Sequence, residues 1–349
     1  MEQHSTVLET EKENPARTRF SVIIPVYNVE KYIEFCLDNV LPAISPQDEV
    51  IISLGQSTDA SNEIAKKYSQ QYENIRLLMQ EGKGLSDARN CAMKAAKGDY
   101  LIFIDGDDYV KTEKLRQAIE MIRQDGNTYD LYAFDYYVDD QRRGRSELRA
   151  QIGTKAPFDG VENLPQIMKK RQCFWNTWRF IYRRRFLQEN DLLFWANTYC
   201  EDVDFTTRCL LASPRMAFRH TPYYCYILGR SGSLMNEVTV QRVADTEKSL
   251  RTSIERLKNC DKTFAKFAID RFQFEYALNM ALIQEVSAQD RQKALSCFSD
   301  ANEVLSGSSD PVVKILWVAI KLGGVKRLGN VLYRIKKRRR EGIGRKTGK

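Results

Sequence analysis

Residues 100–110 read YLIFIDGDDYV, an apolar run that ends in three carboxylates within four positions. Similar apolar runs lie upstream at residues 20–27 (FSVIIPVY), 49–54 (EVIISL) and 75–79 (IRLLM), and each is followed by a segment with helical periodicity. Continuous apolar strands that alternate with amphipathic helices are typical of a parallel sheet covered on both faces. The sequence therefore predicts a doubly wound α/β domain with a mostly parallel sheet.

The unusual residues of this domain gather where the predicted strands end, which is where ligands bind in doubly wound sheets. Asp105, Asp107 and Asp108 follow the fourth strand, and carboxylates this close raise one another's pKa unless a cation or hydrogen bonds offset the repulsion. Mg²⁺ or Mn²⁺ would offset it and would complete its shell with substrate phosphates. A plain turn before a helix near Thr112 is the alternative, and these residues alone leave both open.

The rest of the chain differs from this repeating pattern. Two more strand-like stretches are expected at residues 129–138 and 216–228, on either side of a segment rich in aromatics and arginine. From about residue 236 the pattern changes to long helices, so we expect the α/β domain over 20–235 and an all-α appendage over 236–310. Residues 1–19 are polar and are expected to be a disordered lead-in rather than a signal peptide.

Charge is concentrated near the C-terminal end. Residues 314–349 hold 13 Lys and Arg and one Glu, a net charge of +12, so the rest of the chain carries −4, which argues against a nucleic-acid partner. Residues 311–349 are predicted to form a basic amphipathic helix, broken at Gly323-Gly324, and a polybasic tail. The helix could bind an anionic membrane surface or could dock on the protein and leave only its charges in water. Its expected apolar face consists of Val325, Leu328, Val331, Leu332 and Ile335.

Cysteine and histidine usage points to a cytosolic protein without a zinc site. The eight cysteines have no short C-x-x-C spacing, and there are only two histidines. No uninterrupted apolar run reaches the roughly 18 residues that a spanning helix needs. We therefore expect reduced thiols and a cytoplasmic, peripheral location.

Three motifs in order resemble the nucleotide-sugar glycosyltransferases of family 2, which have the Rossmann-like GT-A fold. The motifs are SVIIPVYNVEKYIEFCLDNVL (21–41), GLSDARNCAMKAAKGDYLIFIDGDD (84–108) and CEDVDF (200–205). The resemblance covers about 60% of the chain and implies an inverting, metal-dependent transfer of a sugar from a nucleotide-diphosphate donor to a glycan acceptor. Bacterial members of this type act in cell-surface polysaccharide assembly, so the resemblance and the basic helix together suggest an acceptor linked to polyprenyl diphosphate.

The resemblance also implies roles for particular residues. Asp202 would be the catalytic base, Asp107 a direct metal ligand, and Asp105 a ligand of the ribose or of the metal shell. The other donor-binding candidates are Pro25, Tyr27, Glu30, Asp59, Arg89 and Arg230. The acceptor-binding candidates are Trp175, Trp178, Arg179 and Glu201. Structural alternatives exist, because Glu201 and Asp202 could simply favour a helix N-terminus and a Trp pair is more often part of a core.

One position departs from the family pattern. The second strand of relatives ends in V-D-D-G-S-T-D, whereas Leu54 and Gly55 stand here in place of the two aspartates that help to hold the base. A leucine cannot accept a hydrogen bond from the base, and one missing charged partner can cost about 1.5–3 kcal/mol. The chain could be an active enzyme, with a UDP-sugar as the first choice of donor, or a non-catalytic scaffold in a glycan assembly complex. A nucleotidyltransferase would also use a metal, but the Gly-rich loop expected near its first strand is absent.

Overall fold

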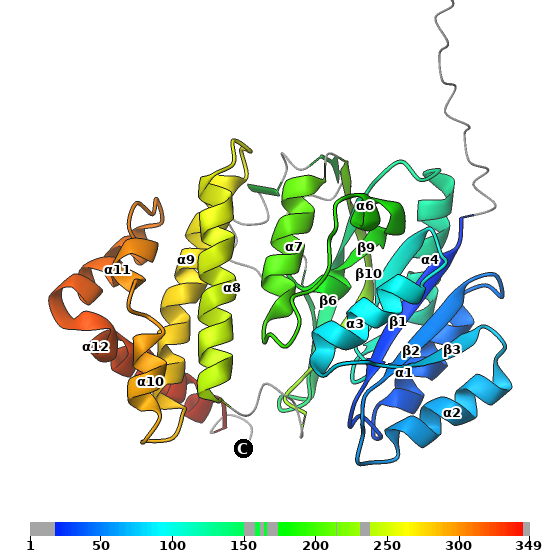
Figure 1. Cartoon of the computed structure of the whole chain (residues 1–349), viewed down its shortest axis with the longest axis horizontal. Helices are drawn as coiled ribbons and strands as arrows, with labels where there is room; N and C mark the ends of the chain where they lie inside the picture. The colour runs from blue at the N-terminus through cyan, green and yellow to red at the C-terminus, as the bar shows by residue number, and fades with distance from the viewer. Residues whose placement is uncertain are drawn as a thin grey trace, which may run out of the picture.

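The computed structural model describes residues 18–149, 158–160, 164–165, 174–213, 215–230 and 238–344. The expected lead-in up to residue 17 and the last residues of the polybasic tail lie outside these ranges. One sheet runs through the α/β part (Figure 1). Its strand order is β3-β2-β1-β4-β9-β6-β10-β5, with β7 paired to β6 and β8 to β10. The strands are β1 (Phe20–Val26), β2 (Glu49–Leu54), β3 (Ile75–Met79), β4 (Tyr100–Phe103), β5 (Tyr109–Val110), β6 (Leu131–Asp140), β7 (Arg145–Arg149), β8 (Phe158–Asp159), β9 (Phe180–Arg183) and β10 (Met216–Leu228).

The first four strands are parallel, as the sequence predicts. Ile23 on β1 lies between Ile51 on β2 and Phe103 on β4. The chain moves outward from β1 to β2 and β3 and then returns to the other side of β1 as β4. The strand order therefore reverses between β1 and β4, and the loops after these two strands flank the expected ligand position.

Two helical layers cover the sheet because successive strand residues face opposite sides. Val22 and Ile24 share an apolar cluster with α1 (Ile33–Val40), α2 (Ser61–Gln71) and α4 (Thr112–Gln124). Ile23 faces the other side, where α3 (Gly84–Ala95), α6 (Arg184–Glu189) and α7 (Glu201–Ala212) contribute to the cluster. The doubly wound α/β architecture expected from the sequence is confirmed.

Strand β9 is the main feature of the sheet that the sequence did not predict. It is antiparallel to both neighbours and separates β4 from β6, with Ile181 opposite Ile102 on one side and Tyr132 on the other. Its four residues lie in the aromatic and arginine-rich segment, followed directly by the arginines of α6. Four residues are too few to show the alternation of apolar and polar side chains by which a strand is recognised in a sequence.

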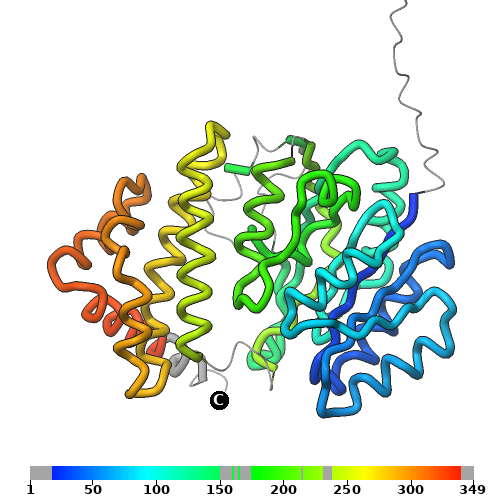
Figure 2. The backbone as a smooth tube through the Cα atoms, in the orientation of Figure 1, coloured from blue at the N-terminus to red at the C-terminus, as the bar shows by residue number. Residues whose placement is uncertain are grey.

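The C-terminal part is all helical, as expected, and lies beside the α/β part, with α8 next to α7 (Figures 1 and 2). The two parts share a continuous apolar core. Val203 of α7 and Phe272 of α9 belong to the same buried cluster as Ile23. The domain boundary predicted near residue 236 would therefore separate two parts that share one core. The helices are α8 (Val240–Lys258), α9 (Ala265–Asn279), the 3₁₀ helix η6 (Met280–Gln284), α10 (Arg291–Ser296), α11 (Ala301–Val304) and α12 (Pro311–Gly344).

Helix α12 is kinked at Gly324, whose φ of 72° only glycine adopts easily, so the expected break is confirmed. Beyond the kink, Leu328 is buried, and a Cβ at Gly329 would lie 2.7 Å from the carbonyl oxygen of Met280 in η6. The predicted apolar face is thus divided, because part of it docks on the protein while Val331 and Ile335 remain about half exposed. No helix in the described ranges is both long and apolar enough to cross a membrane.

Candidate active site

The loop after β4 (residues 105–108, called the cation-side loop below) is held tightly against its neighbours. Gly106 crosses close to β1, and a Cβ there would lie 2.9 Å from the carbonyl oxygen of Pro25. Asp108 is buried and accepts hydrogen bonds of 2.7 Å from the Tyr224 hydroxyl and from the Ile227 backbone N–H. Burial and the nearby Asp105 raise the pKa of Asp108 well above its ordinary value. Asp108 therefore fastens the loop to β10.

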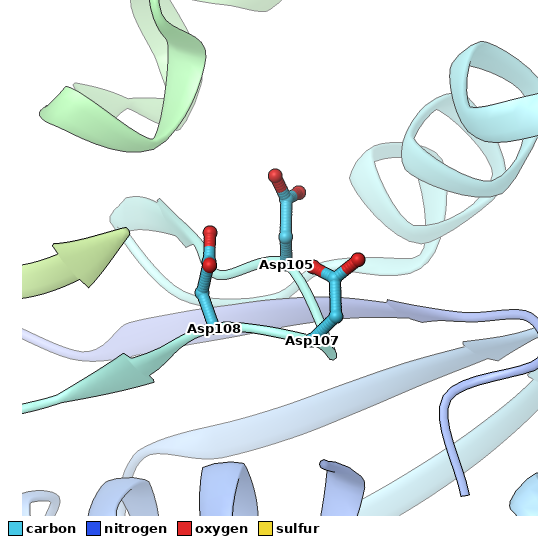
Figure 3. A group of neighbouring side chains, drawn as sticks. All are labelled: Asp105, Asp107 and Asp108. Atoms are coloured by element: carbon cyan, nitrogen blue, oxygen red, sulfur yellow. The ribbon is translucent and has the colours of Figure 1, made fainter. Parts of the chain in front are cut away.

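The remaining carboxylates of this loop suit a divalent cation. Asp105, Asp107 and Asp108 each place a carboxylate oxygen within 4.8 Å of the others, and their side chains leave the loop on the same side (Figure 3). Since both carboxylate oxygens of Asp108 accept bonds from β10, Asp105 and Asp107 are the pair better placed to hold a cation. Arg230, just beyond β10, forms an ion pair with Asp107, so a cation at this place would compete with a guanidinium.

Arg89 on α3 joins the cation-side loop to the start of α7. Its side chain is 2% exposed and donates to Asp105 Oδ1 at 2.7 Å and to Glu201 Oε1 at 2.6 Å. The guanidinium carbon also lies 5.3 Å from the ring centroid of Phe194. Asn90, the next residue, fixes Phe194 by exchanging hydrogen bonds with its backbone N–H and C=O. The A-R-N motif thus builds a bridge between two acidic segments, and its contact with a donor stays a prediction.

The turn before α7 (residues 199–202, called the base-side turn below) aims two carboxylates into the same region. Cys200 has φ 57° and ψ 38°, the left-handed conformation that non-glycine residues rarely adopt, and α7 begins at Glu201. Asp202 is half-buried, and desolvation and the neighbouring Glu201 raise its pKa to about 8 although Arg89 opposes the shift. A carboxylate with a pKa near the working pH is suited to general-base catalysis.

The loops after β1 and β2 carry the donor-binding candidates Tyr27, Glu30 and Asp59. Tyr27 is 51% exposed, and a Cβ at Gly55 would lie 3.0 Å from its ring, so the ring rests on the glycine. Asn28 has φ 52°, and its side-chain oxygen accepts the Thr58 N–H at 2.8 Å. Gly55 therefore does more than remove an aspartate, because it makes room for the exposed tyrosine.

Glu30 and Asp59 clip these two loops together. Asp59 accepts the Glu30 N–H at 3.1 Å, and Glu30 in return accepts the Ala60 N–H at 3.1 Å. Burial opposes ionisation of Asp59, but hydrogen bonds from Ser61 hold its pKa below the ordinary value. The structure thus shows a positioning role for both carboxylates, and their contact with a nucleotide remains a prediction.

The three aromatic-segment candidates for acceptor binding lie inside the protein. Trp178 stacks on Tyr224 with ring centroids 4.2 Å apart, and Trp175 packs on Phe272 at 5.4 Å. Arg179 is 1% exposed and donates to the Phe134 carbonyl oxygen at 2.8 Å. Burial explains these residues as core, whereas Glu201 lies in the acidic centre beside Arg89.

Sequence reasoning missed the support that α8 gives to the base-side turn. Asp245 Oδ2 accepts the Tyr199 N–H at 3.1 Å, and Thr246 Oγ1 lies 3.3 Å from Cys200 Sγ. The sequence did carry one sign of this support. The face of α8 that packs on the protein is polar instead of apolar, with five buried residues: Arg242, Asp245, Thr246, Ser249 and Ser253.

Comparisons with known proteins agree with this architecture. The family model described as glycosyl transferase family 2 matches residues 21–191. Glycosyltransferase EpsJ of Bacillus subtilis (strain 168) is 32% identical over 59% of this chain and 60% of its own length. Poly(ribitol-phosphate) beta-N-acetylglucosaminyltransferase TarS of Staphylococcus aureus (strain MW2) is 25% identical over 84% of this chain and 51% of its own. The chain thus aligns with about half to three-fifths of the length of these relatives.

Solved structures show the same fold. S. aureus TarS 1–349 in complex with UDP-GlcNAc superposes with a TM-score of 0.67 at 20% identity, covering 92% of each chain. Mannosyltransferase PcManGT from Pyrobaculum calidifontis in complex with GDP-Man and Mn²⁺ gives a TM-score of 0.54 at 15% identity, covering 93% of this chain and 88% of its own. The likeness to TarS includes the helical part, because its coverage extends well beyond the α/β domain. The chain belongs, through residues 21–191, to glycosyl transferase family 2, and its α/β part has the GT-A fold.

Proposed function

We propose that this protein is an inverting glycosyltransferase that moves a hexose or N-acetylhexosamine from a nucleotide-diphosphate donor to a glycan acceptor. The observation that carries the proposal is the Arg89 bridge, with bonds of 2.7 Å to Asp105 and 2.6 Å to Glu201. This bridge places the carboxylates suited to a cation beside Asp202, the carboxylate suited to accept a proton. A metal-bound leaving group and a base on the acceptor hydroxyl are the two requirements of the transfer.

The donor would lie over the loops after β1, β2 and β4. Asp107 and Asp105 would hold Mn²⁺ or Mg²⁺, which when bound supplies positive charge to the leaving diphosphate. Tyr27 would pack on the base. Arg230 would leave its ion pair with Asp107 and form one with the diphosphate of the donor. A UDP-sugar is the first candidate, since TarS was solved with UDP-GlcNAc, and PcManGT, solved with GDP-Man and Mn²⁺, is the precedent for the cation.

Asp202 would take the proton of the acceptor hydroxyl as that oxygen attacks the anomeric carbon. Its pKa of about 8 leaves it a stronger base than an ordinary aspartate. Glu201 is tied to Arg89 and would orient the turn or the acceptor rather than move a proton. Attack opposite the departing nucleotide inverts the anomeric carbon.

Calorimetric titration tests the donor site. UDP, GDP, CDP and dTDP are titrated with and without Mn²⁺ into the wild type, into Asp107→Ala, and into Glu120→Ala, which removes an exposed carboxylate on α4. We expect Mn²⁺-dependent binding of one nucleotide, lost in Asp107→Ala and kept in Glu120→Ala. If none of the four nucleotides binds, the result would contradict the proposal and favour a non-catalytic scaffold. The replacement of the family's two aspartates by Leu54 and Gly55 points the same way.

We further propose that the acceptor is carried on a lipid and that α12 contacts an anionic membrane surface. Before the kink, Ile315, Val318 and Leu322 lie on one face of the helix, and they are 67%, 47% and 83% exposed. Exposed basic residues flank this stripe and continue beyond the kink: Lys314, Lys321, Lys326, Arg327, Arg334 and Lys337. An exposed apolar stripe beside cationic side chains suits the headgroup region of an anionic bilayer. The half of α12 before the kink is thus better suited to contact a membrane than the apolar face that the sequence predicted beyond the kink.

Vesicle sedimentation tests this contact without deleting α12, which docks on the protein through Val313 and Ile320 before the kink and through Leu328 beyond it. We expect the wild type to pellet with vesicles that contain phosphatidylglycerol and to stay in solution with pure phosphatidylcholine. Ile315→Ser/Val318→Ser/Leu322→Ser should release it, whereas Lys66→Gln/Lys67→Gln on α2 should not. Equal sedimentation of the triple variant and the wild type would refute the membrane contact.

A further inference from the structure

The start of α7 is held in a conformation that its own sequence does not favour. Cys200 is in the left-handed region, which costs a non-glycine residue about 1–3 kcal/mol and persists only where surrounding contacts impose it. The residue that follows begins α7, so the direction in which Glu201 and Asp202 leave the chain depends on this turn. Something outside α7 must therefore fix it.

The contacts that fix the turn come from one side of α8. Asp245 accepts the Tyr199 N–H at 3.1 Å through Oδ2, and its Oδ1 accepts the Gln241 side-chain amide at 2.7 Å. Thr246, the next residue, has its hydroxyl 3.3 Å from the Cys200 sulfur. Asp245 is 7% exposed, so its carboxylate is shielded from water that would otherwise compete for the Tyr199 N–H.

A second contact farther along α8 keeps the two helices in register. Asp204 of α7 is 1% exposed and lies 2.6 Å from Arg208 and 3.5 Å from Arg256 of α8. Asp245 and Arg256 thus contact the chain on both sides of Asp202, at Tyr199 before α7 and at Asp204 within it. The N-terminal end of α7 cannot shift without breaking these polar contacts with α8.

We propose that Asp245 is a positioning residue that holds the Tyr199–Cys200 turn and thereby aims Asp202 at the acceptor. This inference rests on the proposed function for its catalytic consequence. It places the helical part of the chain in the catalytic machinery, although that part lies outside the residues that the family model matches.

The first arm of the test is steady-state kinetics of Asp245→Ala, Asp245→Asn and a matched control. Glu255→Gln removes a carboxylate from the same helix at a side chain that is 54% exposed. We expect Asp245→Ala to lower kcat by about 10–100-fold, as a small misplacement of a catalytic group does, without changing the dissociation constant of the nucleotide. Asp245→Asn keeps an amide oxygen for the Tyr199 N–H and should recover part of kcat, and Glu255→Gln should match the wild type.

The second arm needs no enzymatic activity. Burial and the nearby Asp202 raise the pKa of the Cys200 thiol to about 12, so Cys200 should react slowly with iodoacetamide. Release of the turn in Asp245→Ala should speed alkylation of Cys200 about tenfold or more, as a fall of one pKa unit would, with Cys297 as the internal reference. Peptide mass spectrometry follows both thiols under conditions in which each variant stays folded.

The two arms separate the two proposals. If Cys200 is alkylated faster in Asp245→Ala while the wild type transfers no sugar, the positioning contact is supported and the proposed enzymatic function is contradicted. Unchanged alkylation, or a kcat within about twofold of the wild type, overturns the positioning role. If Asp245→Ala does not fold, Asp245→Asn carries both measurements, with smaller effects in the same direction.

Discussion

The cation-side loop and the base-side turn bring carboxylates to one place by different means. The loop is held from the sheet, because Asp108 bonds to β10 and Gly106 packs on Pro25 of β1. The turn is held from the helical part, through Asp245 and Thr246 of α8. The loop lies within the residues that the family model matches and the turn lies beyond them. A local motif can therefore specify the first half of such a site, whereas the second half needs a partner helix supplied later in the chain.

Substitution of Asp202 should separate the two halves most sharply. Asp202→Asn removes the base and leaves the cation-side loop intact, so kcat should fall by about 10²–10⁴-fold while nucleotide binding stays unchanged. Single-turnover kinetics together with calorimetry would measure both quantities. A joint loss of binding and turnover would show that the two halves are not independent.

Loss of Arg89 should affect both halves at once. Removing the buried guanidinium leaves Asp105 and Glu201 without their shared partner, and breaking a buried ion pair costs about 3–5 kcal/mol. We expect Arg89→Met to lower the free energy of unfolding by that order in urea titrations. The salt bridge of Arg185 and Glu189 is exposed, so Arg185→Met should change stability by less than about 1 kcal/mol.

The pH dependence of catalysis should report the base-side turn alone. Asp202 acts when ionised and its pKa is raised to about 8, so kcat/KM should rise with pH and reach half its maximum near pH 8. An unperturbed aspartate would place this limb near pH 4. Since Arg89 opposes the upward shift, Arg89→Met should move the limb to still higher pH in whatever fraction remains folded. A flat profile between pH 5 and 9 would argue against Asp202 as the base.

The smallest effect is expected where the chain departs from its family. A Cβ at Gly55 would lie 3.0 Å from the Tyr27 ring, so Gly55→Ala should displace the ring and weaken nucleotide binding severalfold, or about 1 kcal/mol. In a Tyr27→Ala background the same change should have almost no effect. Additive losses in this double-mutant cycle would show that Gly55 acts on the nucleotide without Tyr27.

The sequence predicted well those features that depend on local pattern. The strands from residue 20 to 103, their helices, the all-α character after residue 236 and the break at Gly324 follow from hydrophobic periodicity and from glycine. The grouping of Asp105 and Asp107 at the reversal of strand order follows from topology. The fold rules of parallel sheets are enough for all of these.

The remainder depends on pairings between distant residues. Glu201 lies 112 positions from Arg89, and Asp245 lies 46 from Tyr199, so no local pattern links them. The sequence left open whether Trp175 and Trp178 contact an acceptor or belong to a core, and burial places them in the core. In α12, tertiary contacts such as that of Gly329 with η6 and the burial of Leu328 show which residues of an amphipathic helix are docked.

The position of β9 has a consequence for how the chain folds as it is synthesised. Strands β1 to β4 are complete at residue 103, but β4 has no partner on its outer edge until residues 180–183 arrive. Tyr100, Leu101 and Ile102 would then present an apolar, unpaired edge, which is a site for aggregation. A chain that stops before residue 180 should therefore be recovered as aggregate, and the sheet closes in its middle rather than at its rim.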